Sequence, residues 1–177
     1  MGRKIPCVEF YMDGLNCDPA SFDKECELLN CKWKKNQRYN EVKSHHYIIS
    51  FDPKDALENG LTGEQAQAFC LEFARKHFAG YQALMVTHTD GHHHVGNIHT
   101  HIVFNSVRKE TVERQDYMDQ PNDHKTGYKH RQTKQFLRYL QKELMTMCNE
   151  KCLHQVDLLT PAPIIITNEE YRARGKG

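Results

Sequence analysis

Apolar and polar residues alternate along the chain in patterns that predict strands. Residues 82–89 and 97–107 follow the period of two that a half-buried strand shows. Residues 43–51 form a third strand-like run, which Asp52 and Pro53 end. The chain therefore contains strands that expose one face and bury the other.

Helices are expected where apolar residues recur at near-helical spacing. The clearest one follows a capping box formed by Thr62 and Gln65 and ends at Gly80. Further helices are predicted at 18–34, from Thr133 onwards and from Thr167. Residues 108–127 are predicted to be a long loop, and residues 153–159 a short strand.

The order of these elements indicates the fold class. Strands and helices are mixed without a regular βαβ rhythm, so we expect an α+β fold with an antiparallel sheet and helices on one face. The other face is then left for a ligand. The 177 residues fit one domain, 1–177, and both ends look cut, so we expect a piece of a longer protein.

The composition says more about the cellular compartment of the protein than about its function. The formal net charge is +1, which neither requires nor excludes a polyanionic partner. The seven cysteines form no Cys-x-x-Cys pair. With no signal peptide and no apolar run of membrane-spanning length, we expect a reducing cytoplasm and no membrane segment.

Three histidines give the two central strands candidate chemistry. His99 and His101 share a face of their strand, and His88 reaches the same face if the two strands pair antiparallel. Three imidazoles leave open positions on a bound metal ion, as catalytic sites require. Asp90 is placed to orient a ligand imidazole. The alternative is that each histidine is an ordinary surface or satisfied core residue.

Basic residues interleaved with aromatic residues are candidates for nucleic-acid binding. Residues 125–142 carry six Lys or Arg and no acid, and a second cluster surrounds the only tryptophan. The alternative is a solvated helix face. The candidate DNA-binding residues are Lys32, Trp33, Lys34, Arg108, Tyr128, Lys129, Arg131, Lys134 and Arg138.

The histidine strands resemble the metal motif of HUH endonucleases, and more narrowly that of MOB-P relaxases, the mobilisation nucleases of plasmids and conjugative transposons. The motif residues are His88-Thr89-Asp90 and then His99-Thr100-His101 through Asn105-Ser106. The resemblance extends over about residues 7–160. Three upstream segments match in the same order: 16–19, 45–53 and 78–81.

The resemblance implies a fold, a mechanism and partners. The fold would be an antiparallel sheet of about five strands flanked by helices, with His88, His99 and His101 holding Mg²⁺ or Mn²⁺. A tyrosine would attack a phosphodiester of single-stranded origin DNA, and the resulting phosphotyrosyl link would allow rejoining. His46 would lie near the site as a phosphate or second-layer partner. Single-stranded or hairpin origin DNA and conjugation accessory proteins are the expected partners.

The nucleophile and the exact activity stay open at this stage. Tyr11 is the first tyrosine and a candidate nucleophile, but it is equally a candidate packing residue, with the attacking tyrosine upstream of Met1. The chain would then bind origin DNA without cutting it. Another alternative is an HUH replication initiator or a metal-dependent nucleic-acid phosphoesterase that does not rejoin strands.

Overall fold

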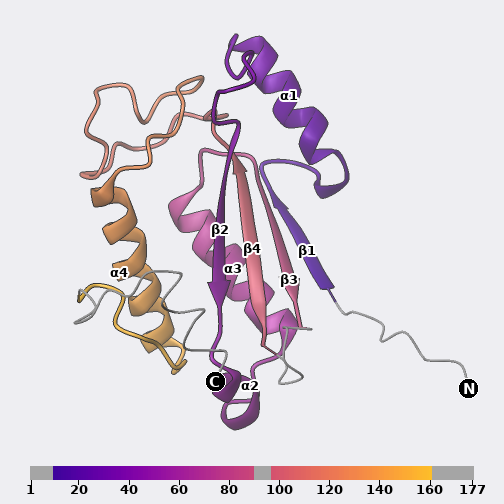
Figure 1. The fold of residues 1–177 in the computed structure, drawn as a ribbon, viewed down its shortest axis with the longest axis vertical. Helices are drawn as coiled ribbons and strands as arrows, with labels where there is room; N and C mark the ends of the chain where they lie inside the picture. Colours follow the sequence, from indigo (N-terminus) through magenta and orange to yellow (C-terminus); the bar gives the residue numbers. More distant parts are fainter. Residues whose placement is uncertain (1–9, 90–96, 161–177) are drawn as a thin grey trace, which may run out of the picture.

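The computed structural model describes residues 10–89 and 97–160. Figure 1 shows these residues as a sheet with helices around it. In chain order the elements are β1 (Phe10–Leu15), η1 (Pro19–Ser21), α1 (Phe22–Lys32), β2 (Ser44–Ser50), α2 (Pro53–Glu58), α3 (Gly63–His77), β3 (Ala83–His88), β4 (His99–Asn105) and α4 (Lys134–Glu150).

The strands form one antiparallel sheet. Its order is β1-β3-β4-β2, so β3 and β4 are the inner strands and β1 and β2 are the edges. The α+β prediction is confirmed, although the described residues supply four strands and not about five. Alternation along each strand then divides the side chains between two faces, which differ in what covers them.

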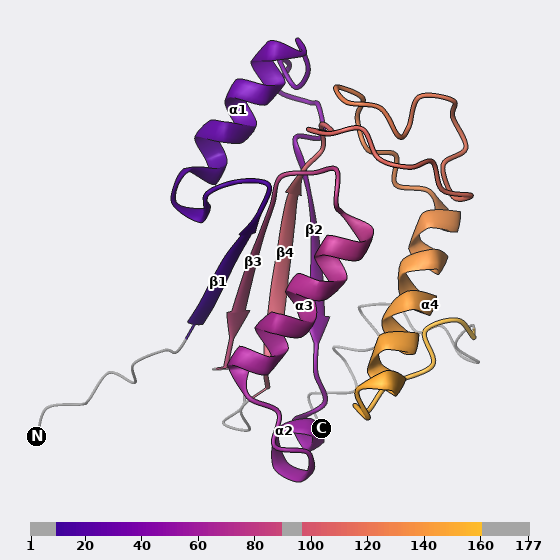
Figure 2. The same ribbon diagram turned by 180° about the vertical axis from the view of Figure 1, so that it is seen from behind.

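One face is covered by helices and the other is largely open. Figure 2 shows α3 lying across the strands, with α4 beside the β2 edge. Figure 1 views the opposite face, where α1 lies near one end and no helix of the described residues crosses the middle. The position of α3 agrees with the expectation that helices would gather on one face, whereas α1 lies against one end of the other face. We call the two sides the covered face and the open face.

The core lies between α3 and the covered face. On β4 the side chains of Thr100, Ile102 and Phe104 are fully buried, and on β3 those of Ala83, Met85 and Thr87 are too. The apolar stripe of α3 meets them with buried residues from Ala66 to Ala74. The Phe104 ring stacks on that of Phe78 at 4.7 Å between centroids. Burying aromatic rings of this size is the main stabilising contribution of the covered face.

Local signals set the bounds of most elements. The α3 helix begins with the predicted capping box, in which Thr62 and Gln65 each accept a backbone N–H of the other. The expected helix at 18–34 starts with a short 3-10 turn and ends at Lys32, because Lys34 has a positive φ of 52°. The expected helix from Thr167 lies outside the described residues.

One local prediction is wrong, and two elements of the structure were not predicted. The short strand at 153–159 is wrong, since these residues form no strand. His154 donates its backbone N–H and its Nδ1–H to Asp55 Oδ1, at 2.9 and 2.8 Å, so this segment is held by α2 and pairs with no strand. Helix α2 and strand β1 were not predicted. Asp52 and Pro53, which end the strand, also cap and begin α2.

Candidate metal centre and nucleic-acid face

Three histidines come together on the open face. His88 lies directly opposite His99, and Val86 lies opposite His101, in the β3–β4 ladder. The ring centroids are 5.4 Å apart for His88 and His99, 5.4 Å for His88 and His101, and 5.2 Å for His99 and His101. The expected convergence of these side chains on one face is therefore what the register produces.

These separations suit a shared cation. With metal–nitrogen bonds of about 2.1 Å, imidazole centroids lie roughly 3.3 Å from the ion, and so about 4.7–5.4 Å from each other at ligand angles of 90–110°. Among the described residues, however, no group of three or more His, Cys, Asp or Glu side chains can hold a metal ion as it stands. The His88 and His99 rings are stacked, with planes 22° apart. A rotation of the rings is therefore needed before their nitrogens point to one position.

Hydrogen bonds on the Nδ1 atoms leave nitrogens available for a ligand. His99 Nδ1 lies 3.2 Å from the carbonyl oxygen of Asn97, which can only accept, so Nδ1 carries the proton and Nε2 keeps its lone pair. His101 Nδ1 lies 2.8 Å from His46 Nε2. A proton on that Nδ1, donated to His46, leaves Nε2 of His101 free in the same way. Ligand orientation of this kind is common at metal centres.

The surroundings of His101 favour its neutral form. Partial burial, followed by the neighbouring imidazoles of His46, His99 and His88, lowers the pKa of His101 below its ordinary value. A neutral imidazole is the form that binds a metal ion. His46 itself stacks against His101 at 5.0 Å between centroids, so the structure places it beside the three histidines, where it was expected.

A polar network on the covered face supports the strands that carry the histidines. The hydroxyls of Thr87 and Thr100, directly opposite each other, lie 2.6 Å apart. Thr87 donates to Gln67 Oε1 at 2.5 Å, and Gln67 donates to Asp13 at 2.8 Å. The network joins α3, β1, β3 and β4 at the level of His88 and His99. Sequence reasoning missed it, although Thr87 and Thr100 each adjoin a candidate ligand.

Three polar residues of the segments that resemble relaxases form hydrogen bonds that stabilise the fold. Asn105 donates to Gln82 Oε1 at 3.3 Å and accepts from the Val107 backbone at 3.2 Å. Ser106 donates to the Val42 carbonyl at 2.8 Å. Asn16, in the left-handed region with φ 56°, donates to the Tyr81 carbonyl at 2.8 Å. These residues join the strand ends to neighbouring loops, away from the histidines.

Tyr11 is not brought to the histidines. It lies opposite Thr87 in the β1–β3 ladder, and alternation puts it on the covered face. Its ring lies against the first turn of α3, where a Cβ on Gly63 would be 2.6 Å from Tyr11 Cε2. The sheet itself stands between Tyr11 and the open face. Asp90, the third candidate with a catalytic role, lies outside the described residues.

Most of the candidate DNA-binding residues are at the surface. Lys32, Lys34, Lys134 and Arg138 are exposed, as are Tyr128 at 45% and Trp33 at 38%. Trp33 packs on Gly127, where a Cβ would lie 2.4 Å from Trp33 Cδ2. Two of the candidates already have acidic partners. Lys129 lies 3.6 Å from Glu41, and Arg131 lies 3.5 Å from Asp119.

The prediction that Arg108 binds DNA is wrong. It is only 5% exposed, its guanidinium donates to the Tyr81 hydroxyl at 2.6 Å and lies 4.2 Å from the Tyr81 ring, and Nε donates to the Asp123 carbonyl. A guanidinium held this way anchors the loop after β4 and is not available to DNA. The even-numbered residues of β4 face the covered side, so continuing the alternation past Ser106 would have placed Arg108 there.

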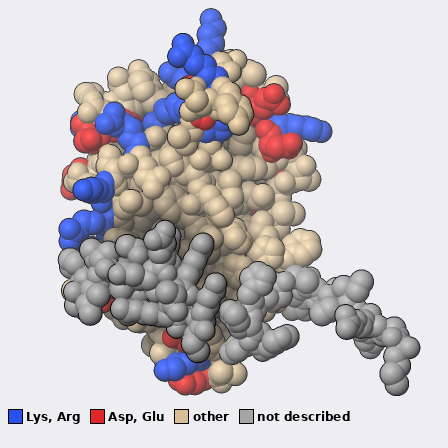
Figure 3. Space-filling view, in the orientation of Figure 1, with Lys and Arg blue, Asp and Glu red and all other residues tan. Residues whose placement is uncertain are grey.

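The charges lie at the margins of the open face. Figure 3 shows Lys and Arg side chains gathered at the end near α1 and along the side of α4, with neither charge in the middle. The middle carries the histidines together with exposed apolar side chains, namely Phe10 at 61%, Met12 at 46% and Ile48 at 56%. Asp and Glu side chains lie at the same margins, so the rim is mixed in charge. Its cations and the apolar middle are the two kinds of contact that a single strand makes, through its phosphates and its bases.

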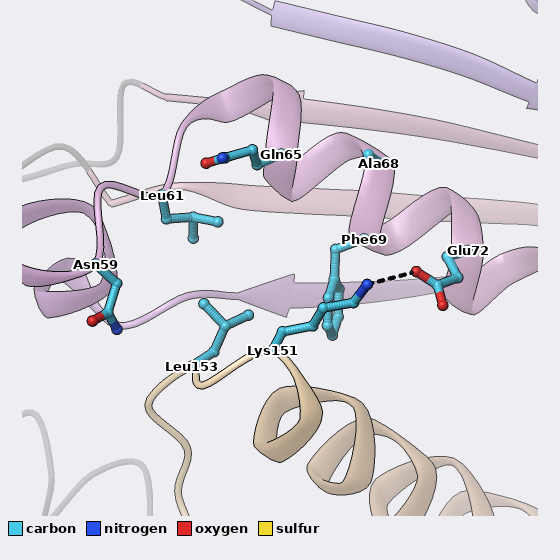
Figure 4. Close-up of a pocket in the computed structure, with 8 residues that line it drawn as sticks. All are labelled: Asn59, Leu61, Gln65, Ala68, Phe69, Glu72, Lys151 and Leu153. Carbon is cyan, nitrogen blue, oxygen red and sulfur yellow. Dashed lines mark ion pairs between the residues drawn. The ribbon is translucent and has the colours of Figure 1, made fainter.

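A cavity on the covered side is separate from this face. It has a volume of about 350 Å³ and lies between α3 and the segment after α4 (Figure 4). Leu61, Phe69 and Leu153 give it apolar walls, and an ion pair of Lys151 and Glu72 at 3.4 Å borders it. It contains none of the candidate site residues.

Comparisons with known proteins agree on one family. The family model described as relaxase, MobA/VirD2-like, nuclease domain matches residues 6–153. Protein rlx of Staphylococcus aureus is 33% identical over 120 residues, which are 62% of this chain and 33% of that relative. The group II intron-interrupted relaxase LtrB of Lactococcus lactis subsp. cremoris is 30% identical over 103 residues, 58% of this chain and 17% of that relative. The matched part is thus a third or less of each relative.

Two further findings complete the comparison. No solved structure was found to match the chain. No helix in the described ranges, 10–89 and 97–160, is long and apolar enough to cross a membrane.

Proposed function

The chain belongs to the relaxase family with the MobA/VirD2-like nuclease domain, and from that premise we propose that it binds single-stranded DNA of a transfer origin and nicks it with a divalent cation. The observation that carries the proposal is the set of three imidazoles, 5.2–5.4 Å apart, on an open sheet face. A structural role would place such residues in the core, whereas these lie where a long substrate has access.

His88, His99 and His101 would hold the cation, Mg²⁺ or Mn²⁺, with His99 and His101 binding through Nε2. When bound, the cation polarises a phosphodiester and stabilises the negative charge that develops on it. The carbonyl of Asn97 and the ring of His46 keep the imidazoles of His99 and His101 in the ligating tautomer. Their role is orientation, since neither group needs to touch the DNA to perform it.

The strand would lie across the open face. Phe10, Met12 and Ile48 offer apolar surfaces to its bases, and the exposed Lys32, Lys34, Lys134 and Arg138 offer cations to its phosphates. Phosphate contacts supply affinity without sequence preference, so these four residues would hold the strand in place more than select it.

The position of Tyr11 favours a second candidate function. An attacking hydroxyl must come within about 3–3.5 Å of the scissile phosphate. Tyr11 lies against Gly63 on the covered face, and the phosphate would lie on the open face. The second candidate is therefore a chain that binds the metal ion and the origin strand but does not itself supply the attacking tyrosine.

Calorimetric titration with Mn²⁺ tests the metal site. We expect one ion per chain, and His99→Ala should weaken binding at least about 100-fold, because two ligands and water replace three ligands. Ile48→Ala is the matched control, since Ile48 lies opposite His101 on the same face and offers no nitrogen. Equal affinity of the wild type and His99→Ala would exclude the site.

Incubation with an origin oligonucleotide and Mn²⁺ separates the two candidate functions. A covalent protein–DNA adduct, seen as a mass shift, supports nicking by this chain. Tyr11→Phe then decides the nucleophile, because loss of the adduct with retained binding requires the Tyr11 hydroxyl. Binding without any adduct supports the second candidate.

A further inference from the structure

The side chains of Ser50 and Asn97 form a hydrogen-bonded pair beside the three histidines. Asn97 donates its Nδ2–H to Ser50 Oγ at 3.2 Å, and Asn97 Oδ1 lies 3.4 Å from the same oxygen. Ser50 is the residue of β2 that lies directly opposite His99 in the β2–β4 ladder. Residues paired in this way share a face of the sheet, so Ser50 lies on the open face next to a candidate ligand.

The pair fixes one end of the peptide group whose carbonyl holds the His99 ring. This carbonyl, of Asn97, lies 3.2 Å from His99 Nδ1 and belongs to the peptide group between Asn97 and Ile98. Ile98 is 6% exposed, and its own carbonyl accepts the backbone N–H of Phe51 at 3.0 Å. The core therefore fixes the Ile98 end of the peptide group. The side-chain bond to Ser50 fixes the Asn97 end.

The position of this carbonyl decides which nitrogen of His99 is free. A neutral imidazole carries one proton, on Nδ1 or on Nε2. A carbonyl held near Nδ1 keeps the proton there, so that Nε2 retains the lone pair that binds a cation. If Asn97 turned away, His99 could carry its proton on Nε2 and would lose that lone pair. Groups that orient ligand imidazoles in this way raise metal affinity.

Strand β2 supports the second imidazole of β4 as well. His46 Nε2 lies 2.8 Å from His101 Nδ1, and by alternation His46 and Ser50 share the open face. Strand β2 supplies none of the three candidate ligands. Each ligand of β4 nevertheless has an Nδ1 partner that β2 provides, directly through His46 or by holding Asn97. The backbone bond between Phe51 and Ile98 already pairs the strands at this end, so pairing does not require the Ser50 side chain.

We propose that Ser50 is a positioning residue of the metal centre, which acts through Asn97 to keep His99 in the tautomer that binds the cation. The inference rests on the proposed function, because it requires His99 to be a ligand. It gives the edge strand β2 a role in cation binding at both ends of the histidine cluster.

The tautomer of His99 in the metal-free chain is the first test. Long-range proton–nitrogen NMR spectra of a chain labelled at histidine distinguish the two neutral tautomers, and the His99 signals are those that His99→Ala removes. In the wild type the proton should reside on Nδ1. In Ser50→Ala the signals should shift toward the Nε2–H form. Ser50→Thr keeps a hydroxyl and suits a strand, so it should restore the wild-type spectrum.

Calorimetric titration with Mn²⁺ is the second test. Ser50→Ala should bind the ion about tenfold more weakly than the wild type, and Ser50→Thr should restore the affinity. The midpoint of urea unfolding should stay the same, because Ser50 is exposed. Ser44→Ala is the matched control, since Ser44 is an exposed serine on the same face of the same strand, opposite Asn105. It should keep the wild-type spectrum and affinity.

The outcomes separate this inference from the proposed function. If the wild type binds Mn²⁺ and Ser50→Ala keeps both the tautomer and the affinity, Ser50 is not a positioning residue and the proposed function stands. A lower urea midpoint with unchanged tautomer and affinity would give the pair a structural role only, which also refutes the inference. If the wild type binds no Mn²⁺, the metal centre and the inference fail together.

Discussion

The two faces of the sheet are made by the same strands and have opposite contents. On β4, Thr100, Ile102 and Phe104 are fully buried under α3, while the alternate residues His99, His101 and Val103 are only half-buried. The covered face is filled with stacked rings and paired hydroxyls. The open face carries imidazoles and exposed apolar side chains that contribute little to stability where they lie.

The two faces of the same strands therefore have different roles. The covered face fixes the strands through packing and through the Thr87–Thr100–Gln67 network. The open face can then hold its imidazoles at set distances without itself needing a core. Binding sites built on rigid strands are more exact than sites on loops. The comparison predicts that substitutions on one face change stability, whereas those on the other change binding.

The largest effect is expected at the centre of the covered face. Phe104→Ala should lower the free energy of unfolding by about 3–5 kcal/mol, because it leaves a cavity among the rings of Phe78, Tyr47 and Tyr81. Urea unfolding measures this loss. Val103→Ala, one residue away on the open face, should cost about 1 kcal/mol or less. Similar losses of unfolding free energy for both variants would show that the two faces contribute equally to stability.

A pH dependence of stability should arise from the buried His77 at the end of α3. His77 is 5% exposed, and burial lowers its pKa from 6.5 to about 4. Because the unfolded chain binds the proton first, the stability from neutral His77 is complete above pH 6.5 and is lost as the pH falls toward 4. The loss is at most about 3 kcal/mol.

The variant His77→Phe tests this assignment. Its free energy of unfolding should fall less steeply than that of the wild type between pH 6.5 and 4. The difference between the two proteins at pH 7.5 isolates the packing change, since both forms are neutral there. His130, whose pKa burial lowers to about 3, should keep part of the slope in both proteins. Parallel curves over this range would show that His77 does not contribute.

On the open face, the expected effect is on binding. His46→Ala should weaken Mn²⁺ binding about 10- to 100-fold, because His101 loses the partner that orients it. The free energy of unfolding should change by less than about 0.5 kcal/mol, as for other exposed positions. Calorimetry and urea unfolding measure the two quantities. A variant that is destabilised but binds Mn²⁺ normally would assign His46 to the fold.

The smallest effect concerns the rim of the open face. Replacing Lys134 and Arg138 with Gln should lower the slope of log affinity against log salt for dT12 by about 0.7 for each lost phosphate contact. Lys129 and Arg131 have acidic partners, so the matched pair Lys129→Gln and Arg131→Gln should change the slope less. Anisotropy titrations between 50 and 200 mM salt, roughly the range in which such slopes are read, measure it. Equal changes for both pairs would mean that the acidic partners do not matter.

Much of the architecture was predictable from local patterns. The strands at 83–88 and 99–105 and the helix at 63–77 fall within about three residues of their predicted bounds. Alternation and capping are local properties, so they are readable without knowledge of the fold. Strand β1 was missed, and the strand at 153–159 was wrong, because the partners of these segments lie far away in the chain. Helix α2 was missed although Asp52 and Pro53 give a local signal for its start.

The sequence by itself determined the alternation of the histidine strands, which puts His99 and His101 on one face in any sheet that contains this strand. Only the tertiary structure decided that His88 joins them and that Tyr11 faces the other way, whereas the burial of Arg108 follows from alternation once the covered face is known. Each of these depends on the register between strands, or on which face α3 covers. A cavity beside α1 could not be predicted from the sequence either, since its walls come from α1 and from strands later in the chain. Register and covering are set by packing between distant segments, which no local spacing encodes.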